Sequence, residues 1–253
     1  MKDVKEVEIV SEFNLEEQEA ISLERVEERY ALEDEMLSAI SEGNYARGME
    51  AMNKISQLPM SRYRDANAGV LQKQIALLTL NTLFRKAVQE AEVHPAHVDH
   101  VSHKFADRIM EAESDEEMSS LGMEMVRKYC LMVRSYSLRG YSELTRETLN
   151  YIDFNLTEEL SLAKLADKLN VNKKYLSAHF KKEVGENVTD YVNKKRIKES
   201  LKYLGITTMS ISDVALRVGI YDTNYFSRVF KKIMHMTPSE YRHMLTKPMK
   251  ENN

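Results

Sequence analysis

Two segments of the sequence carry side chains suited to hydrogen bonding with nucleic acid. One presents Lys174, Ser177 and Lys181, and the other presents Asn224 and Arg228, at spacings of three or four residues. An arginine guanidinium can donate two parallel hydrogen bonds to guanine, and an asparagine amide can pair with adenine. Hydroxyl and ammonium groups beside them can bind phosphate oxygens. The residue types therefore indicate recognition of a duplex by hydrogen bonding, provided that an element places them on one exposed face.

The two segments are copies of one pattern. "KYLSAHFKK" (174–182) and "NYFSRVFKK" (224–232) share Tyr, Ser, Phe and Lys-Lys at an offset of 50, and Tyr191 and Tyr241 follow at the same offset. Upstream, apolar residues match at an offset of 49, with one residue inserted near Lys173. The matched upstream residues are Leu162, Leu165, Ala166, Leu169 and Val171 in one copy, and Ile211, Val214, Ala215, Val218 and Ile220 in the other.

Each copy has the pattern of a helix, a short turn and a second helix. The turns are predicted at 170–172 and 219–222. The second helices are expected to bury, respectively, Leu176, Phe180 and Val184, and Phe226, Phe230 and Met234. Their opposite faces are polar, which is what a helix-turn-helix needs to enter a major groove. The alternative is a pair of packed helical hairpins with solvated lysines.

A predicted helix of about 16 residues, Val188–Tyr203, joins the two copies. At 1.5 Å per residue it is roughly 24 Å long, and successive major grooves on one face of DNA lie about 34 Å apart. The duplication is therefore interpreted as one reading helix for each of two neighbouring grooves.

Charge and composition divide the chain near residue 140. The residues from Tyr141 onward have 19 basic and 14 acidic side chains, a net charge of +5, whereas residues 1–140 have 17 basic and 26 acidic side chains, a net charge of −9. Such asymmetry favours two domains with different partners. We predict a helical regulatory or oligomerisation domain at 1–139 and a DNA-binding domain at 140–253, with helix-turn-helix units at about 161–184 and 210–234.

The fold class predicted is all-α, because only 8 Gly and 4 Pro interrupt a sequence rich in helix formers. The first dozen residues are expected to form one short strand or none. Helices are predicted at 15–40, from Tyr45 to Pro59, and at 66–90, 96–112, 115–138, 142–155, 161–168, 173–184, 188–203, 210–218, 223–234 and 238–245.

The remaining features exclude several classes of protein. A single cysteine, Cys130, excludes an internal disulfide. The N-terminus is too charged for a signal peptide, and the most apolar stretch, 75–84, is too short to span a bilayer. We therefore expect a cytoplasmic protein without membrane contact. No nucleophile elbow, paired-carboxylate site or phosphate loop is present, so we expect neither an enzyme nor a cofactor.

The strings "SLAKLADKLNVNKKYLSAHFKKEVG" and "SISDVALRVGIYDTNYFSRVFKKIMHMTPSEYR" resemble the two helix-turn-helix units of AraC/XylS-type bacterial transcription regulators. The resemblance covers about 140–246. It implies a seven-helix domain that binds double-stranded DNA, and regulation of transcription that is most often activation by recruiting RNA polymerase. The alkyl-repair proteins that share this DNA-binding fold need several cysteines, so the single cysteine of this sequence excludes an alkyl-repair function of that kind.

The resemblance also assigns residues by position. The base-reading positions fall on Lys174, Ser177, Ala178, Thr223, Asn224, Ser227 and Arg228. Apart from the resemblance, Lys181, Lys182, Lys231 and Lys232 lie where they can reach only phosphate or solvent, and we predict phosphate contacts for these four residues and for Lys173 and Ser239. Ala178 departs from the longer polar residue of some family members and offers only a methyl contact. Ser239 lies in "TPSE", which fits a capped helix start with Pro238 in its first turn.

The front half resembles an all-helical region that precedes this DNA-binding domain in some members, and no effector follows from that resemblance. The pattern of its first helix suggests a homodimer with Leu23, Val26, Leu37 and Ile40 as the seam. Two other functions stay open. The helix-turn-helix units could serve protein contacts in a helical adaptor, or the front half could sense a ligand or metal.

Two further patterns are interpreted as structural. His94, His97, His100 and His103 recur at steps of three, but such steps drift around a helix by about 60° each. We therefore expect caps, interior hydrogen bonds or solvated side chains and no metal. Cys130 is interpreted as a small buried core residue.

Overall fold

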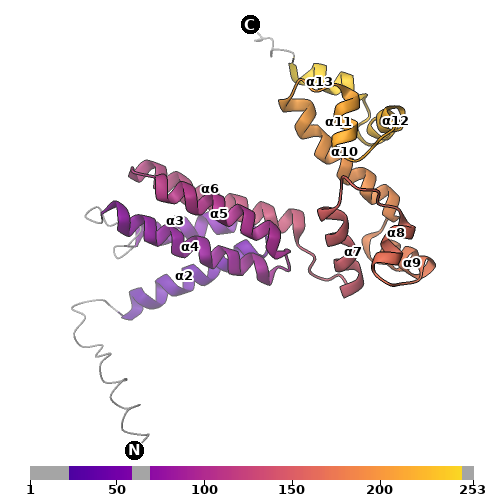
Figure 1. The fold of residues 1–253 in the computed structure, drawn as a ribbon. Coiled ribbons are helices and arrows are strands. Elements are labelled where there is room, and N and C mark those ends of the chain that lie inside the picture. The colour runs from indigo at the N-terminus through magenta and orange to yellow at the C-terminus, as the bar shows by residue number, and fades with distance from the viewer. Residues whose placement is uncertain (1–22, 59–68, 247–253) are drawn as a thin grey trace, which may run out of the picture. The chain divides into compact units, whose positions relative to one another are not determined.

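The computed structural model describes residues 23–58 and 69–246, which form twelve α-helices and no strand (Figure 1). The chain divides into two compact units, and the boundary lies between Arg139 and Gly140. The predicted all-α fold is confirmed for the described residues. The predicted strand and the first part of the helix at 15–40 lie outside them.

The N-terminal unit consists of five helices. They are α2 (Leu23–Ser41), α3 (Tyr45–Gln57), α4 (Val70–Glu90), α5 (Pro95–Glu111) and α6 (Asp115–Tyr136). The long helix α4 packs against α2, α5 and α6, and α6 also packs against α3. Phe84 and Tyr129 are fully buried where α4 and α6 meet, with ring centroids 5.8 Å apart. Helix α4 begins at Val70, later than the predicted start, because Gly69 has an extended backbone as its N-cap.

A buried polar network ties three of these helices together. The Tyr129 hydroxyl of α6 donates to Asn81 Oδ1 of α4 at 2.6 Å, and Asn81 Nδ2 donates to the Ser102 carbonyl of α5 at 3.0 Å. Burial raises the pKa of Tyr129 to about 12. Every member has a partner, so this network specifies one arrangement of α4, α5 and α6.

The histidine-rich segment has structural roles in α5. His94 caps the helix by accepting from Ala96 N at 3.2 Å, and the His97 ring stacks on Tyr136 at a centroid distance of 4.3 Å. The His103 ring interacts with Asp99 one turn earlier, with 3.3 Å between Nδ1 and Oδ2. Within 23–58 and 69–246, no three His, Cys, Asp or Glu side chains are grouped as metal ligands.

Cys130 is fully buried in the N-terminal core, as predicted. Burial raises the pKa of its thiol to about 11, which disfavours the reactive thiolate.

The predicted dimer seam on the first helix is contradicted at two of its four residues, Leu37 and Ile40; Val26 is half-buried, and the side chain of Leu23 lies outside the described part of the structure. Ile40 is fully buried in the N-terminal core, and Leu37 packs against the same core. Helix α2 packs against α3, α4 and α6 of its own unit, so Leu37 and Ile40 are not available to a second copy. Leu37→Asp would consequently test the stability of the unit instead of its association.

The C-terminal unit consists of seven helices. They are α7 (Glu143–Phe154), α8 (Leu162–Lys168), α9 (Lys173–Val184), α10 (Val188–Ile206), α11 (Ile211–Arg217), α12 (Thr223–Met234) and α13 (Pro238–Thr246). Helix α10 extends three residues beyond the predicted Tyr203, because Leu204 is buried in the core and the helix ends only at the Thr207 cap.

Candidate nucleic-acid interface

The first helix-turn-helix is defined by caps at both of its helices. Ser161 Oγ accepts from Lys164 N at 3.2 Å at the start of α8. Asn172 Oδ1 accepts from the backbone amides of Lys174 and Tyr175 at 2.8 and 3.3 Å at the start of α9. Asn170, in the turn between the helices, has a φ of 53°, which Asn adopts more readily than most residues.

The second helix-turn-helix repeats this construction. Ser210 Oγ accepts from Asp213 N at 3.1 Å at the start of α11, and Asp222 Oδ1 accepts from the amides of Asn224 and Tyr225 at 2.8 and 3.0 Å at the start of α12. The left-handed turn residue is now Gly219, with a φ of 81°. Side-chain caps satisfy helix amides that otherwise lack partners, so both turns are set by short-range hydrogen bonds.

The repeat continues into a third helix in each copy. Asn187 caps α10 through Asp190 N at 2.9 Å, and Thr237 caps α13 through Glu240 N at 3.2 Å. These helices contribute the tyrosines that recur in the sequence. Tyr191 contacts Phe180 edge-on at 5.6 Å, and Tyr241 contacts Phe230 at 5.8 Å. Each tyrosine therefore braces the buried aromatic residue of the preceding helix.

The copies differ in the residue that ends the second helix. Gly185 ends α9 with a φ of 84°, whereas His235 ends α12 with a φ of 60°. Glycine adopts this left-handed conformation without steric cost, and residues with a Cβ do not.

We expect His235→Gly to raise the free energy of unfolding of the C-terminal unit by about 0.5–1 kcal/mol, because glycine relieves the left-handed strain. The reciprocal variant, Gly185→His, should lower it by a similar amount. Thermal and urea unfolding of the full chain checks both. A loss of stability on His235→Gly would show that the imidazole has a stabilising contact outweighing the strain.

Helix α10 is anchored to both copies. Its Arg196 donates from Nε to the Leu156 carbonyl at 2.9 Å and from Nη2 to the Glu158 carbonyl, both in the loop between α7 and α8. Its Asn193 Nδ2 donates to the hydroxyl of Tyr225 on α12 at 2.8 Å. Burial lowers the pKa of Arg196. These contacts make α10 a spacer that fixes the two copies relative to each other.

Gly219 brings the second turn against the same loop. A Cβ added at Gly219 would lie 2.8 Å from the Thr157 carbonyl oxygen and 2.9 Å from that of Leu156. Only glycine permits this approach, because its neighbours are backbone atoms.

A side-chain network joins α9 to the start of α7. Ser142 Oγ donates to Glu183 Oε2 at 2.9 Å and lies 2.7 Å from His179 Nε2. The pKa of Glu183 is lowered, first by a hydrogen bond from Thr145 and further by those from Ser142. The same nitrogen of His179 faces both Ser142 and Glu183, so the three groups hold two helices together and do not form a catalytic relay.

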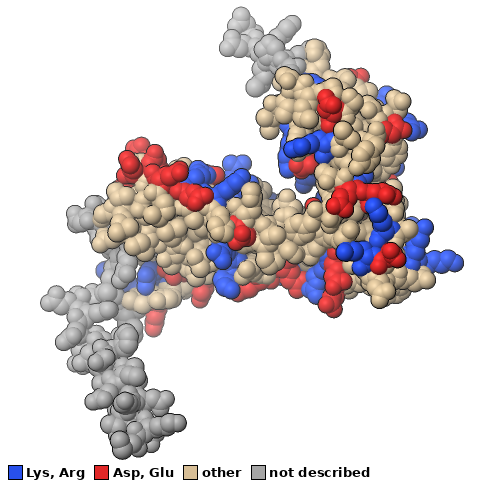
Figure 2. All heavy atoms as spheres, viewed as in Figure 1, with Lys and Arg blue, Asp and Glu red and all other residues tan. Residues whose placement is uncertain are grey.

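The polar face predicted for α9 is exposed. Its core side has the fully buried Phe180 and Leu176, which is 1% exposed. Val184 is only half-buried, as is Met234 in the other copy, because both lie in the last turn of their helices. The assigned residues Lys173, Lys174, Ala178, Lys181 and Lys182 are exposed, and Ser177 is half-buried. On the face shown in Figure 2, Lys and Arg gather over α8 and α9.

The corresponding face of α12 is also accessible. Asn224, Arg228, Lys231 and Lys232 are exposed, and Thr223 and Ser227 are half-buried. The Arg228 guanidinium lies 5.9 Å from the centroid of the Tyr225 ring. Lys232 Nζ lies 3.6 Å from Asp190 on α10, but its side chain is 75% exposed. Ser239 is exposed in the first turn of α13. Two backbone amides there already have side-chain partners, because Thr237 N donates to the Glu240 carboxylate and Glu240 N donates to the Thr237 hydroxyl.

Sequence reasoning did not identify three exposed tyrosines at the same surface. Tyr175 and Tyr225 occupy equivalent positions in α9 and α12 and are 56% and 36% exposed, and Tyr221, next to the α12 cap, is 74% exposed. The repeat marks the first two in the sequence, and both also have contacts within the unit: the Tyr225 hydroxyl accepts from Asn193 at 2.8 Å, and the Tyr175 ring stacks on His179 at a centroid distance of 5.5 Å. Sequence reasoning also did not identify the hydrogen bonds of Arg196 to the loop between α7 and α8 or the close approach of Gly219 to the same loop.

No described helix combines the length and apolar character needed to cross a membrane. Residues 165–244 match the model of a family described as a helix-turn-helix domain.

Two curated relatives come from Bacillus subtilis. The bifunctional transcriptional activator/DNA repair enzyme AdaA is 38% identical over 94 residues, 37% of this chain and 44% of AdaA. The uncharacterized HTH-type transcriptional regulator YtdP is 24% identical over 212 residues, 83% of this chain and 27% of YtdP. This chain thus spans less than half the length of either relative.

Among solved structures, the C-terminal domain of the two-component response regulator yesN from Fusobacterium nucleatum is 34% identical. The match covers 40% of this chain and 99% of that domain, with a TM-score of 0.39. The family match at 165–244 and the two capped helix-turn-helix units show that the C-terminal unit contains a helix-turn-helix domain of the AraC type, and the curated relatives that match it are described as transcription regulators.

Proposed function

We propose that the whole protein is a sequence-specific transcription regulator that inserts α9 and α12 into successive major grooves. The observation that carries this proposal is the repetition of one construction, in which equivalent caps start the two reading helices and both present polar side chains to solvent. Helix α10 has 19 residues, so it is about 28 Å long. Together with its anchors at Arg196 and Asn193, this length suits two readers about one helical turn of DNA apart.

Selection of DNA sequences by the full chain, followed by footprinting, tests this geometry. We expect a non-palindromic site of roughly 20 base pairs with two protected major-groove segments. Protection of a single groove would contradict the two-reader arrangement. The absence of any preferred sequence would favour the helical adaptor, in which the two faces bind protein.

We assign two kinds of contact within this interface. Base reading is proposed for Lys174, Ser177, Ala178, Thr223, Asn224, Ser227 and Arg228. Phosphate contact is proposed for Lys173, Lys181, Lys182, Lys231, Lys232 and Ser239. The first set lies in the N-terminal and middle turns of the reading helices, and the lysine pairs lie in their last turns. Recognition helices commonly contact bases through their N-terminal residues.

Lys231→Ala is expected to weaken binding to all DNA sequences nearly equally. A phosphate contact is independent of sequence, so its loss should also reduce the slope of log K against log salt by about one. Binding isotherms at several salt concentrations measure that slope. Lys104→Ala, at an exposed position of α5, removes the same charge outside the C-terminal unit and is the control. An unchanged slope for Lys231→Ala would place this ammonium in solvent.

Activation by recruiting RNA polymerase is the form of regulation that we propose. The name of AdaA, a transcriptional activator, supports it, and transcription in vitro from a template carrying the selected site distinguishes activation from repression. Self-association through the N-terminal unit is a further proposal, in which Leu37 and Ile40 take no part because their own unit covers them. Sedimentation of the full chain tests it.

A further inference from the structure

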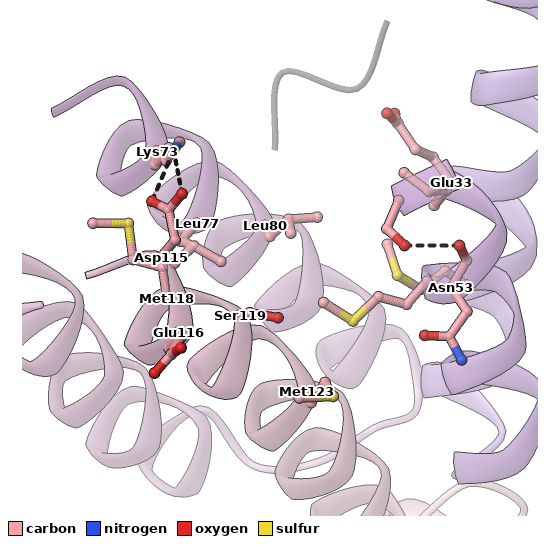
Figure 3. A pocket seen from close by; sticks show the side chains of 14 residues that line it. Glu33, Asn53, Lys73, Leu77, Leu80, Asp115, Glu116, Met118, Ser119 and Met123 are labelled. Carbon is pink, nitrogen blue, oxygen red and sulfur yellow. Dashed lines mark hydrogen bonds and ion pairs between the residues drawn. The ribbon is translucent and has the colours of Figure 1, made fainter. Parts of the chain in front are cut away.

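The N-terminal unit contains a cavity of about 600 Å³ between α2, α3, α4 and α6 (Figure 3). This volume lies within the range of small-molecule sites, which is roughly 300–1,000 Å³. All the residues that line it belong to the N-terminal unit, so nothing in the DNA-binding surface accounts for it.

Most of the lining is aliphatic and thioether. Met36, Met52, Met118 and Met123 contribute sulfur-containing side chains, and Leu77 and Leu80 lie on α4. Methionine is unbranched and polarizable, so such a wall adapts to ligands of different outline. Among the described residues, none that lines the cavity is aromatic, so these residues do not form the aromatic cage that recognises quaternary ammonium groups.

The charged groups at the cavity are mainly acidic. Among the described residues that line it, Glu33, Asp115 and Glu116 are acidic and Lys73 is the single basic residue. Lys73 Nζ lies 2.7 and 2.8 Å from the two carboxylate oxygens of Asp115, so this pair neutralises itself. In Figure 3 the pair lies across the cavity from Glu33.

Two carboxylates are therefore left to set the sign of the field. Arg29, which is not among the lining residues, lies 3.9 Å from the Glu33 carboxylate, and the Glu33 side chain is 17% exposed. Glu116 lies in the first turn of α6. With the Lys73–Asp115 pair neutral, the described lining residues have a formal net charge of −2 from Glu33 and Glu116. A cavity lined by one sign of charge concentrates ligands of the opposite sign.

We propose that this cavity binds a compact apolar amine. The hydrocarbon body of the ligand occupies the methionine and leucine wall, and its protonated amine donates hydrogen bonds to Glu33 or Glu116. Binding at this site is independent of the proposed DNA-binding function, and its measurement requires no DNA.

Three ligands with one hydrocarbon body separate the contributions of shape and charge. Adamantan-1-amine, adamantan-1-ol and adamantane-1-carboxylate present a cationic, a neutral and an anionic head on the same cage. Isothermal titration calorimetry with the full chain is expected to show the amine binding at least about tenfold more tightly than the alcohol, as a charge-assisted hydrogen bond implies. The acid should bind most weakly.

Variants connect that preference to named carboxylates. Glu33→Gln and Glu116→Gln should each be tested. At least one of them should reduce the affinity for the amine about tenfold and leave the affinity for the alcohol unchanged. Glu90→Gln is the matched control, because Glu90 is exposed at the end of α4. It should change the affinity for neither the amine nor the alcohol. Circular dichroism melting confirms that the variants are folded.

Three outcomes would overturn the proposal. Equal affinity for the three ligands would show that charge does not select the occupant. Tightest binding of the acid, strengthened by Asp115→Asn, would make Lys73 the recognition group and the cavity an anion site. No binding of any of the three at millimolar concentration would remove the site itself.

Discussion

Replacing Gly219 by Ala is expected to lower the free energy of unfolding of the C-terminal unit by about 2–5 kcal/mol. Two costs add. Its φ of 81° is a left-handed conformation that costs a residue with a Cβ roughly 1–2 kcal/mol. The new Cβ would also lie 2.8 Å from the Thr157 carbonyl oxygen, and overpacking typically costs about 1–3 kcal/mol.

The loop cannot easily move away from that methyl group, because Arg196 holds it by hydrogen bonds from its guanidinium to two carbonyls. We therefore expect the strain to loosen the contact between the second turn and the loop. Amide hydrogen exchange across α11 and α12 should accelerate, and DNA affinity should fall because the second reader is displaced relative to the first.

Gly185→Ala provides the matched control. Gly185 has a φ of 84°, nearly that of Gly219, but a Cβ there would meet no atom within 4 Å. It should cost only the conformational strain of about 1–2 kcal/mol. Urea unfolding of both variants in the full chain measures the difference. Equal losses would mean that the loop between α7 and α8 relaxes freely. Arg196 would then not fix the spacing between the two helix-turn-helix copies.

The comparison of these glycines also shows what a sequence can reveal. The bounds of α9 and α12 were predicted correctly, since polar caps at Asn172 and Asp222 and left-handed residues at Gly185 and His235 mark both ends locally. The contact of Gly219 with Thr157 joins residues 62 positions apart. No local pattern encodes it, and the same is true of the Arg196 hydrogen bonds.

The error over Leu37 and Ile40, which were predicted to face a second copy, has a related cause. Helical periodicity indicates which face of α2 is buried but does not identify the partner that buries it. Ile40 and Leu37 are in fact covered by their own unit. The cavity was equally inaccessible to sequence reasoning, because its walls come from four helices and the charges at Glu33, Lys73 and Asp115 are far apart in the chain.

Arg228→Ala is expected to weaken binding to the preferred DNA site by about 1–3 kcal/mol and to relax preference at one base position. Arg228 is exposed on α12 and lies two residues before the fully buried Phe230. Two residues correspond to about 200° of rotation, so the guanidinium points away from the core. Its partner among the described residues is the Tyr225 ring, at 5.9 Å, which leaves its five N–H donors available for guanine.

The competing role for Arg228 is an ion pair with Asp222 that holds the helix in place. Asp222 is instead occupied as the α12 cap, accepting from two backbone amides. Under our assignment the melting temperature of Arg228→Ala should stay nearly unchanged, because an exposed side chain without a core contact contributes little. A lower melting temperature with an equal loss of affinity for every DNA sequence would instead support the ion pair.

Arg228→Lys distinguishes recognition from charge. Lysine keeps the positive charge but lacks the planar fork that makes two parallel hydrogen bonds to guanine. We therefore expect it to retain the non-specific affinity and the salt dependence of the unmodified protein while losing most of the preference at one base position. Binding to a panel of single-base variants of the selected site measures this, and a lysine variant with full discrimination would show that Arg228 acts only as a charge beside the phosphates.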